Sequence, residues 1–157
     1  MEIDVAPLGP YNVACIRHVG PYKNVGPVFG ELWNWAKSRE LTAPDTAMMG
    51  LSYDDPDTVP EEQLRYDVCI PVPYGTEGDA RVQVREIPEA LYAQTTHVGS
   101  YDAMNATFNA LYKKAFVDDL YASADGPCIE IYIDDPDTTP EPERRTLIGM
   151  PAKRNAE

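Results

Sequence analysis

The stretch "YDDPDTVPEEQLRYDVCIPV", residues 53–72, decides the fold because the chain spells it a second time. The second version is "IDDPDTTPEPERRTLIGMPA", residues 133–152, at a shift of 80 (133 − 53 = 80). Aspartate side chains bond to nearby backbone amides in turns, and proline fixes φ, so each DDPDT phrase predicts a connector. We expect one helical turn after each phrase and an ion pair from its acids to the following arginine, Arg65 or Arg145.

The duplication continues toward the N-terminus. "HVGPY", residues 18–22, returns as "HVGSY" at a shift of 79, so one residue was inserted after the helix that follows. We interpret the chain as one domain of 157 residues made of two copies of one unit, at 1–73 and 81–152. Between them "PYGTEGDA", residues 73–80, is rich in turn formers and predicts a linker.

Each copy predicts the same order of elements, which gives an α+β fold class. Two extended segments come first, then an amphipathic helix, then two strands on either side of the DDPDT connector. Pro7 and Pro88 are expected to end the first strand of each copy. Pro27 suits the first turn of helix one, and Asp102 could cap helix two. The expected strands are 1–7, 11–20, 47–54 and 65–72 in copy one, and 80–88, 91–100, 127–134 and 145–152 in copy two.

Cysteine usage and hydropathy indicate a cytoplasmic protein. The three cysteines, Cys15, Cys69 and Cys128, are far apart and odd in number, which predicts buried thiols in a reducing compartment. The start, "MEIDVAPLG", lacks the basic and apolar parts of a signal peptide. No run approaches the ~18–20 apolar residues of a membrane helix, so no membrane association is expected.

Charge and aromatic content favour a small-molecule ligand over nucleic acid. The net charge of −13 opposes direct nucleic-acid binding, which rests on Lys and Arg meeting phosphates. It favours cationic ligands, or serves solubility alone. Ten tyrosines and two tryptophans suit a pocket that is apolar in body and polar at points. No nucleotide-binding glycine motif or nucleophile elbow is present, and we expect no cofactor.

The sequence gives little support for a metal site or for catalytic histidines. A metal site at Asp54 and Asp55 is the alternative to a structural turn, but a calcium loop needs more oxygen ligands and a glycine. No metal is therefore expected. His18 and His97 occupy equivalent junctions, and we interpret both as packing or hydrogen-bonding residues rather than catalysts.

The ordered motifs resemble the GyrI-like superfamily over residues 2–152. The matching stretches are "RHVGPY", the helix with "ELWNWA", the first DDPDT region, the second "HVGSY", and "GPCIEIYIDDPDTTPEPERRTLIGMP". This superfamily includes effector-binding domains of AraC- and MerR-type multidrug regulators and stand-alone gyrase-inhibitory proteins. The resemblance implies a tandem strand–helix–strand–strand (SHS2-like) fold, with a concave antiparallel sheet, pseudo-two-fold symmetry and a ligand cleft between two helices. No helix-turn-helix region is seen, so a stand-alone form is expected, with gyrase or a regulator as a candidate protein partner and oligomeric state unknown.

One residue breaks the symmetry of the copies. Glu130 corresponds to Gly50 and sits in the apolar strand "CIEIYI". A lone carboxylate there must face water or be buried with a partner. The resemblance places such a glutamate at the floor of the drug cleft, where it meets cationic or aromatic amphipathic compounds. The aromatic residues that could line this cleft, and add cation–π attraction to a bound cation, are Trp33, Trp35, Tyr53, Tyr66, Tyr112, Phe116 and Tyr132.

Three functions remain open from the sequence. The first is ligand binding without turnover. The second is hydrolysis of cyclopropane-bearing alkylating natural products, with Glu130 as general base and Tyr53 or Tyr66 orienting water or substrate. The third is inhibition of gyrase, or binding of another protein, through the surface.

Overall fold

The computed structural model describes residues 1–155 and divides the chain into two compact units. The α1 unit consists of residues 10–88, and the α2 unit consists of residues 1–9 together with the chain from residue 89 onward. Each unit combines an antiparallel sheet with one α-helix that packs against it. The α+β class expected from the sequence is therefore correct.

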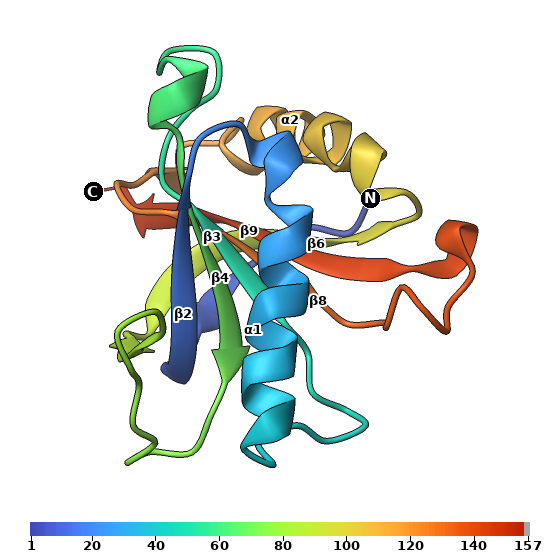
Figure 1. Cartoon of the computed structure of the whole chain (residues 1–157). Helices are drawn as coiled ribbons and strands as arrows, with labels where there is room; N and C mark the ends of the chain where they lie inside the picture. The colour runs from blue at the N-terminus through green and yellow to red at the C-terminus, as the bar shows by residue number, and fades with distance from the viewer. Residues whose placement is uncertain (156–157) are drawn as a thin grey trace. The chain divides into compact units, whose positions relative to one another are not determined.

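The α1 unit has the strand order β3-β4-β2-β5. Its helix runs beside β2 and β4 (Figure 1). Leu32 and Ala36 of the helix are fully buried against strand residues such as Ile16 and Val68, which fixes the helix on one face of the sheet. Pro27 lies in the first turn of α1, as expected. The elements are β2 (Tyr11–Val19), α1 (Gly26–Ser38), β3 (Met49–Ser52), β4 (Arg65–Pro71) and β5 (Gln83–Ile87).

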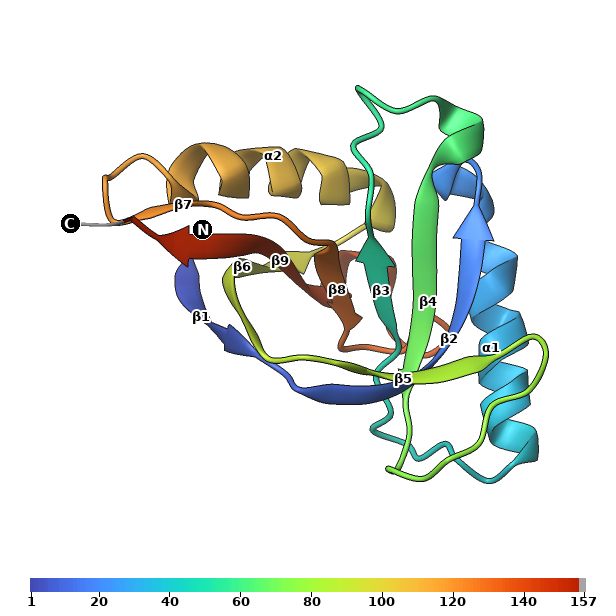
Figure 2. The same ribbon diagram turned by 90° about the vertical axis from the view of Figure 1, so that its left-hand side faces the viewer.

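The α2 unit has the strand order β1-β6-β9-β8, with β7 paired to β9. Figure 2 shows α2 lying along β6 and β9. Met104, Leu111 and Ala115 pack from the helix onto Ala93 and Ile148 of the sheet. The elements are β1 (Asp4–Leu8), β6 (Ala90–Val98), α2 (Met104–Ala115), β7 (Tyr121–Ser123), β8 (Cys128–Tyr132) and β9 (Arg145–Arg154). The short β7 was not foreseen from the sequence.

The units differ from the sequence repeats by an exchange of first strands. Strand β1 begins copy one, yet it pairs with β6 of copy two, from Asp4 opposite Gln94 to Leu8 opposite Ala90. Strand β5 begins copy two, yet it pairs with β2 of copy one. The 73–80 segment, interpreted as a linker, consequently lies within the α1 unit. Pro7 lies inside β1 and does not end it, because β1 is an edge strand of its unit, where a missing N–H is tolerated.

The repeated DDPDT phrase closes the same turn in both copies. Asp55 Oδ1 accepts a hydrogen bond from the backbone N–H of Asp57 at 2.9 Å. Asp54 forms an ion pair with Arg65 at 2.8 Å, and a short 3-10 turn follows at Glu61–Gln63. The second copy repeats these contacts with Asp134, Asp135, Asp137, Arg145 and the turn Glu141–Glu143. The expected helical turns and ion pairs are confirmed. The DDPDT sequence occurs twice because it forms the same turn in each copy.

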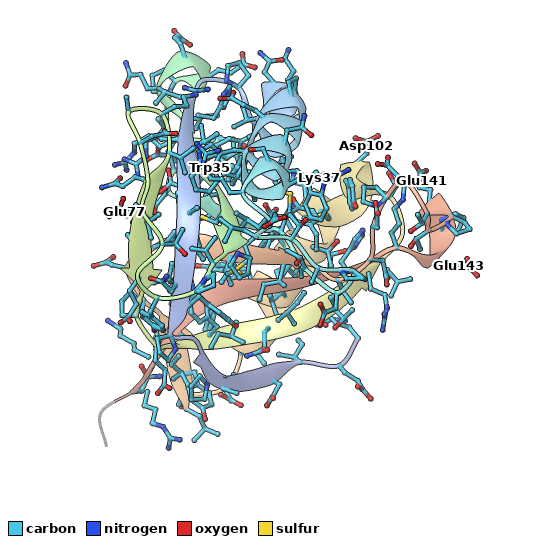
Figure 3. The ribbon with its side chains drawn as sticks, turned by 60° about the horizontal axis from the view of Figure 1, so that its bottom comes forward. Trp35, Lys37, Glu77, Asp102, Glu141 and Glu143 are labelled. Carbon is cyan, nitrogen blue, oxygen red and sulfur yellow. The ribbon has the colours of Figure 1, made fainter. Side chains whose placement is uncertain are left out.

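The start of α2 differs from expectation. A 3-10 turn, Tyr101–Ala103, precedes the helix, and the side chain of Ser100 accepts from the N–H of Asp102 at 3.1 Å. Ser100 therefore caps the 3-10 turn, whereas α2 itself begins after Ala103 without a side-chain cap, so the expected cap by Asp102 is wrong. Figure 3 shows the side chains of Asp102, Glu141 and Glu143 at one end of this unit. Within residues 1–155, neither helix has the length and apolarity needed to cross a bilayer.

Candidate functional site

The strand register determines which face Glu130 occupies. Glu130 on β8 lies opposite Ile148 on β9, and Ile148 lies opposite Thr95 on β6. Residues opposite one another in antiparallel strands project to the same face of the sheet. Ile148 is in the core beneath α2, so Glu130 also projects toward the helix-covered face. Its side chain is correspondingly buried, with the residue only 9% exposed.

A second cross-strand row on this face carries polar groups. Tyr132 lies opposite Thr146, and Thr146 lies opposite His97. His97 Nε2 donates to the carbonyl oxygen of Ser100 at 2.7 Å, and its Nδ1 lies 2.7 Å from the hydroxyl of Thr107 on α2. His97 therefore ties the sheet to the helix and its preceding turn. Its interpretation as a hydrogen-bonding residue is confirmed, as is that of His18, whose Nε2 bonds to the Pro21 carbonyl.

Tyr132 connects the two rows. Its hydroxyl donates to Glu130 Oε1 at 3.2 Å, which places a phenol beside the buried carboxylate. The Tyr132 ring packs edge-on against Tyr101, with ring centroids 5.3 Å apart, and both rings contact the core beneath α2. The carboxylate thus lies next to aromatic surface within its own unit.

The hydroxyl of Thr146 is an unusual polar group in this row. Thr146 is completely buried, and within residues 1–155 its Oγ1 has no hydrogen-bond partner. Leaving a buried hydroxyl unbonded costs about 1–3 kcal/mol, so such groups in folded proteins call for an explanation. Sequence reasoning missed this residue. The signal was present in the comparison of copies, because the small polar Thr146 stands where copy one has the bulky Tyr66.

The α1 unit is apolar at the equivalent positions. Gly50 lies opposite Val68, in place of Glu130 opposite Ile148. Tyr66, expected as a wall residue, is buried and packs against the rings of Tyr22 and Phe29 at 5.6 Å and 6.1 Å. The buried carboxylate is therefore a feature of copy two, as the sequence indicated.

The remaining aromatic candidates are divided between the units. On α2, Tyr112 is 54% exposed and packs its ring edge-on against Phe116 at 5.7 Å. On α1, Trp33 and Trp35 are half-buried against the α1-unit core. The Trp35 indole N–H donates to Asp79 at 2.9 Å. Figure 3 shows Trp35 and Lys37 on different sides of this helix.

Tyr53 belongs to a different environment from Tyr66. Its hydroxyl donates to Asp67 at 2.9 Å and accepts from Arg85 at 2.6 Å. Asp67 neighbours Tyr66 along β4, so the two project to opposite faces of the sheet. Tyr53 is therefore on the face away from α1, and it is a poor partner for a site on the helix-covered face.

An ion cluster surrounds Tyr53 on this second face. Asp67 is buried and accepts from Arg17 at 2.8 Å and from Arg85 at 2.7 Å. Burial alone would raise the pKa of Asp67, but the hydrogen bonds from Arg17 and Tyr53 outweigh it and hold that pKa below its ordinary value. Burial, followed by the nearby Asp67 charge, raises the pKa of Tyr53 to about 12. An open groove of about 760 Å³ is lined by this cluster and Cys15.

A second open groove, of about 910 Å³, lies in the α2 unit. It is lined by residues 1–4, 94–98, Thr107 and Leu147. It reaches Thr95 and His97, which are the row neighbours of Ile148 and Thr146. Across the 155 described residues, no cluster of three or more His, Cys, Asp or Glu side chains is arranged to hold a metal ion.

The sequence is similar to those of known proteins over most of its length. The sequence model of a family described as "GyrI-like small molecule binding domain" matches residues 1–153. A "DNA gyrase inhibitor 2" of Dickeya dadantii (strain 3937) is 34% identical over 139 residues, which cover 86% of this chain and 85% of the relative.

Structure comparisons give the same fold at lower identity. The C-terminal domain of EcmrR is 19% identical, with a TM-score of 0.78 and coverage of 97% of both chains. A hydrolase from Listeria innocua is 12% identical, with a TM-score of 0.68 and coverage of 97% of this chain and 92% of the other. SAV2435 bound to tetraphenylphosphonium is 17% identical, with a TM-score of 0.62 and coverage of 98% and 94%. These likenesses establish a shared architecture.

Proposed function

Because the chain belongs to the GyrI-like small-molecule-binding domain family, we propose that it binds amphipathic aromatic cations, with the Glu130 carboxylate opposite the positive charge. The observation that carries the proposal is the burial of Glu130 on the helix-covered face, beside the rings of Tyr132 and Tyr101. A carboxylate attracts a cation by charge, and aromatic rings beside it add cation–π attraction.

The ligand class follows from charge and surface. A structural neighbour, SAV2435, was solved with tetraphenylphosphonium, a cation enclosed by four aromatic rings. A unit charge about 5 Å from a carboxylate gains about 3 kcal/mol at an effective dielectric constant of about 20. That gain corresponds to roughly a hundredfold in affinity.

The test is calorimetric titration with tetraphenylphosphonium and with the neutral triphenylphosphine oxide. We expect Glu130→Gln to weaken binding of the cation by roughly a hundredfold and to affect the neutral compound little. Glu143→Gln is the matched control, since it removes the same charge from an exposed turn. Equal affinity of wild type and Glu130→Gln for the cation would refute the proposal.

Hydrolysis is a second candidate, favoured by the contact of the Tyr132 hydroxyl with Glu130. A carboxylate that acts as general base needs a neighbouring group to orient water or substrate. Tyr132 is better placed to orient water or substrate than Tyr53 or Tyr66, because its hydroxyl is hydrogen-bonded to Glu130 itself. The hydrolase from Listeria innocua shares the fold.

In the proposed reaction, Glu130 takes a proton from water as the water oxygen bonds to one cyclopropane carbon. The ring C–C bond breaks, and its electron pair passes to the other ring carbon, which takes up the proton from Glu130. Mass spectrometry of a cyclopropane-bearing alkylating compound after incubation separates this function from binding. A ring-opened product that depends on Glu130 supports hydrolysis. A complex from which the compound is recovered unchanged leaves binding alone.

The name of the Dickeya relative adds gyrase inhibition as a third candidate. A DNA supercoiling assay with added protein tests it. Suppression of supercoiling that survives Glu130→Gln indicates a surface-mediated mechanism. Absence of suppression removes this candidate.

A further inference from the structure

Two cysteines that are far apart in the sequence meet in the α1 unit. Cys15 on β2 lies directly opposite Cys69 on β4, and their sulfur atoms are 3.0 Å apart. Both cysteines are buried, Cys69 completely. The second copy has Gln94 and Gly149 at the equivalent positions, so the pair is peculiar to this unit.

The strand geometry already suits a covalent bond between the two sulfurs. Opposed residues in antiparallel strands have Cα atoms about 4.5–5.5 Å apart. Disulfides span Cα separations of about 4.4–6.8 Å. A disulfide between Cys15 and Cys69 therefore needs no movement of either strand, only a turn of the side chains.

The two sulfurs differ in access and in chemistry. The open groove of about 760 Å³ is lined by Cys15 together with Arg17 and Arg85, whereas Cys69 is outside its lining. A hydrogen bond from Cys69 lowers the pKa of Cys15 despite burial, and the charge of Arg85 acts in the same direction. The same hydrogen bond, with burial, raises the pKa of Cys69. Cys15 is thus the attacking sulfur and Cys69 the resolving one.

We propose that the Cys15–Cys69 pair is a site of reversible oxidation by small hydroperoxides, which enter the groove and convert the pair to a disulfide joining β2 to β4. This site is separate from Glu130 and does not depend on ligand binding there.

The reaction balances in two steps. The Cys15 thiolate attacks one peroxide oxygen, the O–O bond breaks, and the departing oxygen leaves as hydroxide or alkoxide and is protonated, which gives a sulfenic acid on Cys15. The guanidiniums of Arg17 and Arg85 line the groove and stabilise the negative charge on the departing oxygen. The Cys69 sulfur then attacks Cys15, the S–O bond breaks, and the hydroxide takes the thiol proton to leave as water. Two thiols lose two electrons in total, and the peroxide is reduced.

The test is treatment of the folded, reduced protein with a limiting amount of hydrogen peroxide, followed by proteolysis and mass spectrometry. We expect a cross-linked peptide containing Cys15 and Cys69 to form first, while Cys128, in the other unit, stays reduced. Dithiothreitol should reverse the cross-link. Oxidation of Cys128 ahead of the pair, or no cross-link until the protein unfolds, would overturn the proposal.

Single variants assign the two roles. In Cys69→Ser, the sulfenic acid on Cys15 persists and is trapped by dimedone. In Cys15→Ser, Cys69 stays reduced, because the groove does not reach it. Dimedone labelling of Cys69 instead of Cys15 would contradict the assignment. The wild-type experiment decides the proposal even if a variant fails to fold.

Discussion

Substitution of Thr146 by valine should stabilise the protein, although it removes a polar group from the interior. Thr146 is fully buried, and within residues 1–155 its hydroxyl has no hydrogen-bond partner. Valine has nearly the same shape and no group to desolvate. An unbonded buried hydroxyl costs about 1–3 kcal/mol, so we expect the free energy of unfolding to rise by about 1 kcal/mol. For a chain of this size, that corresponds to a rise of about 2–4 °C in Tm.

The adjacent Thr95 offers a matched control. Thr95 lies on the same face of β6 as His97 and is also buried, but its hydroxyl donates to the Glu2 carbonyl at 2.6 Å. Thr95→Val should therefore lower the free energy of unfolding by about 1 kcal/mol. Urea denaturation of both variants measures the two signs. A loss of stability in Thr146→Val equal to that in Thr95→Val would contradict this prediction, because it would mean that the Thr146 hydroxyl is hydrogen-bonded.

The Thr146→Val variant should change the stability of the protein without changing its affinity for tetraphenylphosphonium. Thr146 is completely buried and lines neither groove, so its hydroxyl is not accessible to a ligand in this structure. Tetraphenylphosphonium has no hydrogen-bonding group, so its affinity should not change in Thr146→Val.

Three further predictions concern the α1 unit. Asp67→Asn should lower the free energy of unfolding by about 2 kcal/mol, since it weakens the ion pairs of a buried carboxylate to two half-exposed arginines. Because the folded-state pKa of Asp67 is lowered, the contribution of this carboxylate to stability is present above the ordinary aspartate pKa and is lost as pH falls through the lower value. Acid titration of the variant should not show this loss of stability. Because the pKa of Tyr53 is raised to about 12, the contribution of its protonated hydroxyl to stability should be lost as pH rises from 10 to about 12, and Tyr53→Phe should remove one tyrosine that ionises near pH 12 from an ultraviolet titration. Trp35→Phe should lower the free energy of unfolding by about 1 kcal/mol by removing the hydrogen bond to Asp79, and an unchanged urea midpoint would contradict this.

The local parts of the fold could be predicted because neighbouring residues determine them. The Asp55 turn, the Asp54–Arg65 ion pair and Pro27 at the start of α1 all follow from short-range chemistry. The exchange of β1 and β5 could not be predicted in this way. Both strands are short and similar in pattern, and nothing in either one specifies which copy supplies its partner.

The burial and the faces of the candidate residues follow in part from the sequence. Glu130 was singled out because Gly50 stands at the equivalent position in copy one. Tyr53 and Tyr66 were offered as alternatives for one role, and the structure places them on opposite faces of their sheet, as alternation along the strands indicates. The pairing of Cys15 with Cys69 depends on the register of β2 against β4, which no local signal records.

The most direct test of cation binding at Glu130 is a crystal structure of the protein with bound tetraphenylphosphonium. We expect the phosphonium to lie against the Glu130 carboxylate, with its phenyl rings on Tyr132 and neighbouring aromatic side chains. A phosphonium bound elsewhere, with the Glu130 carboxylate and the Tyr132 hydroxyl still in their 3.2 Å contact and enclosed by protein side chains alone, would contradict it.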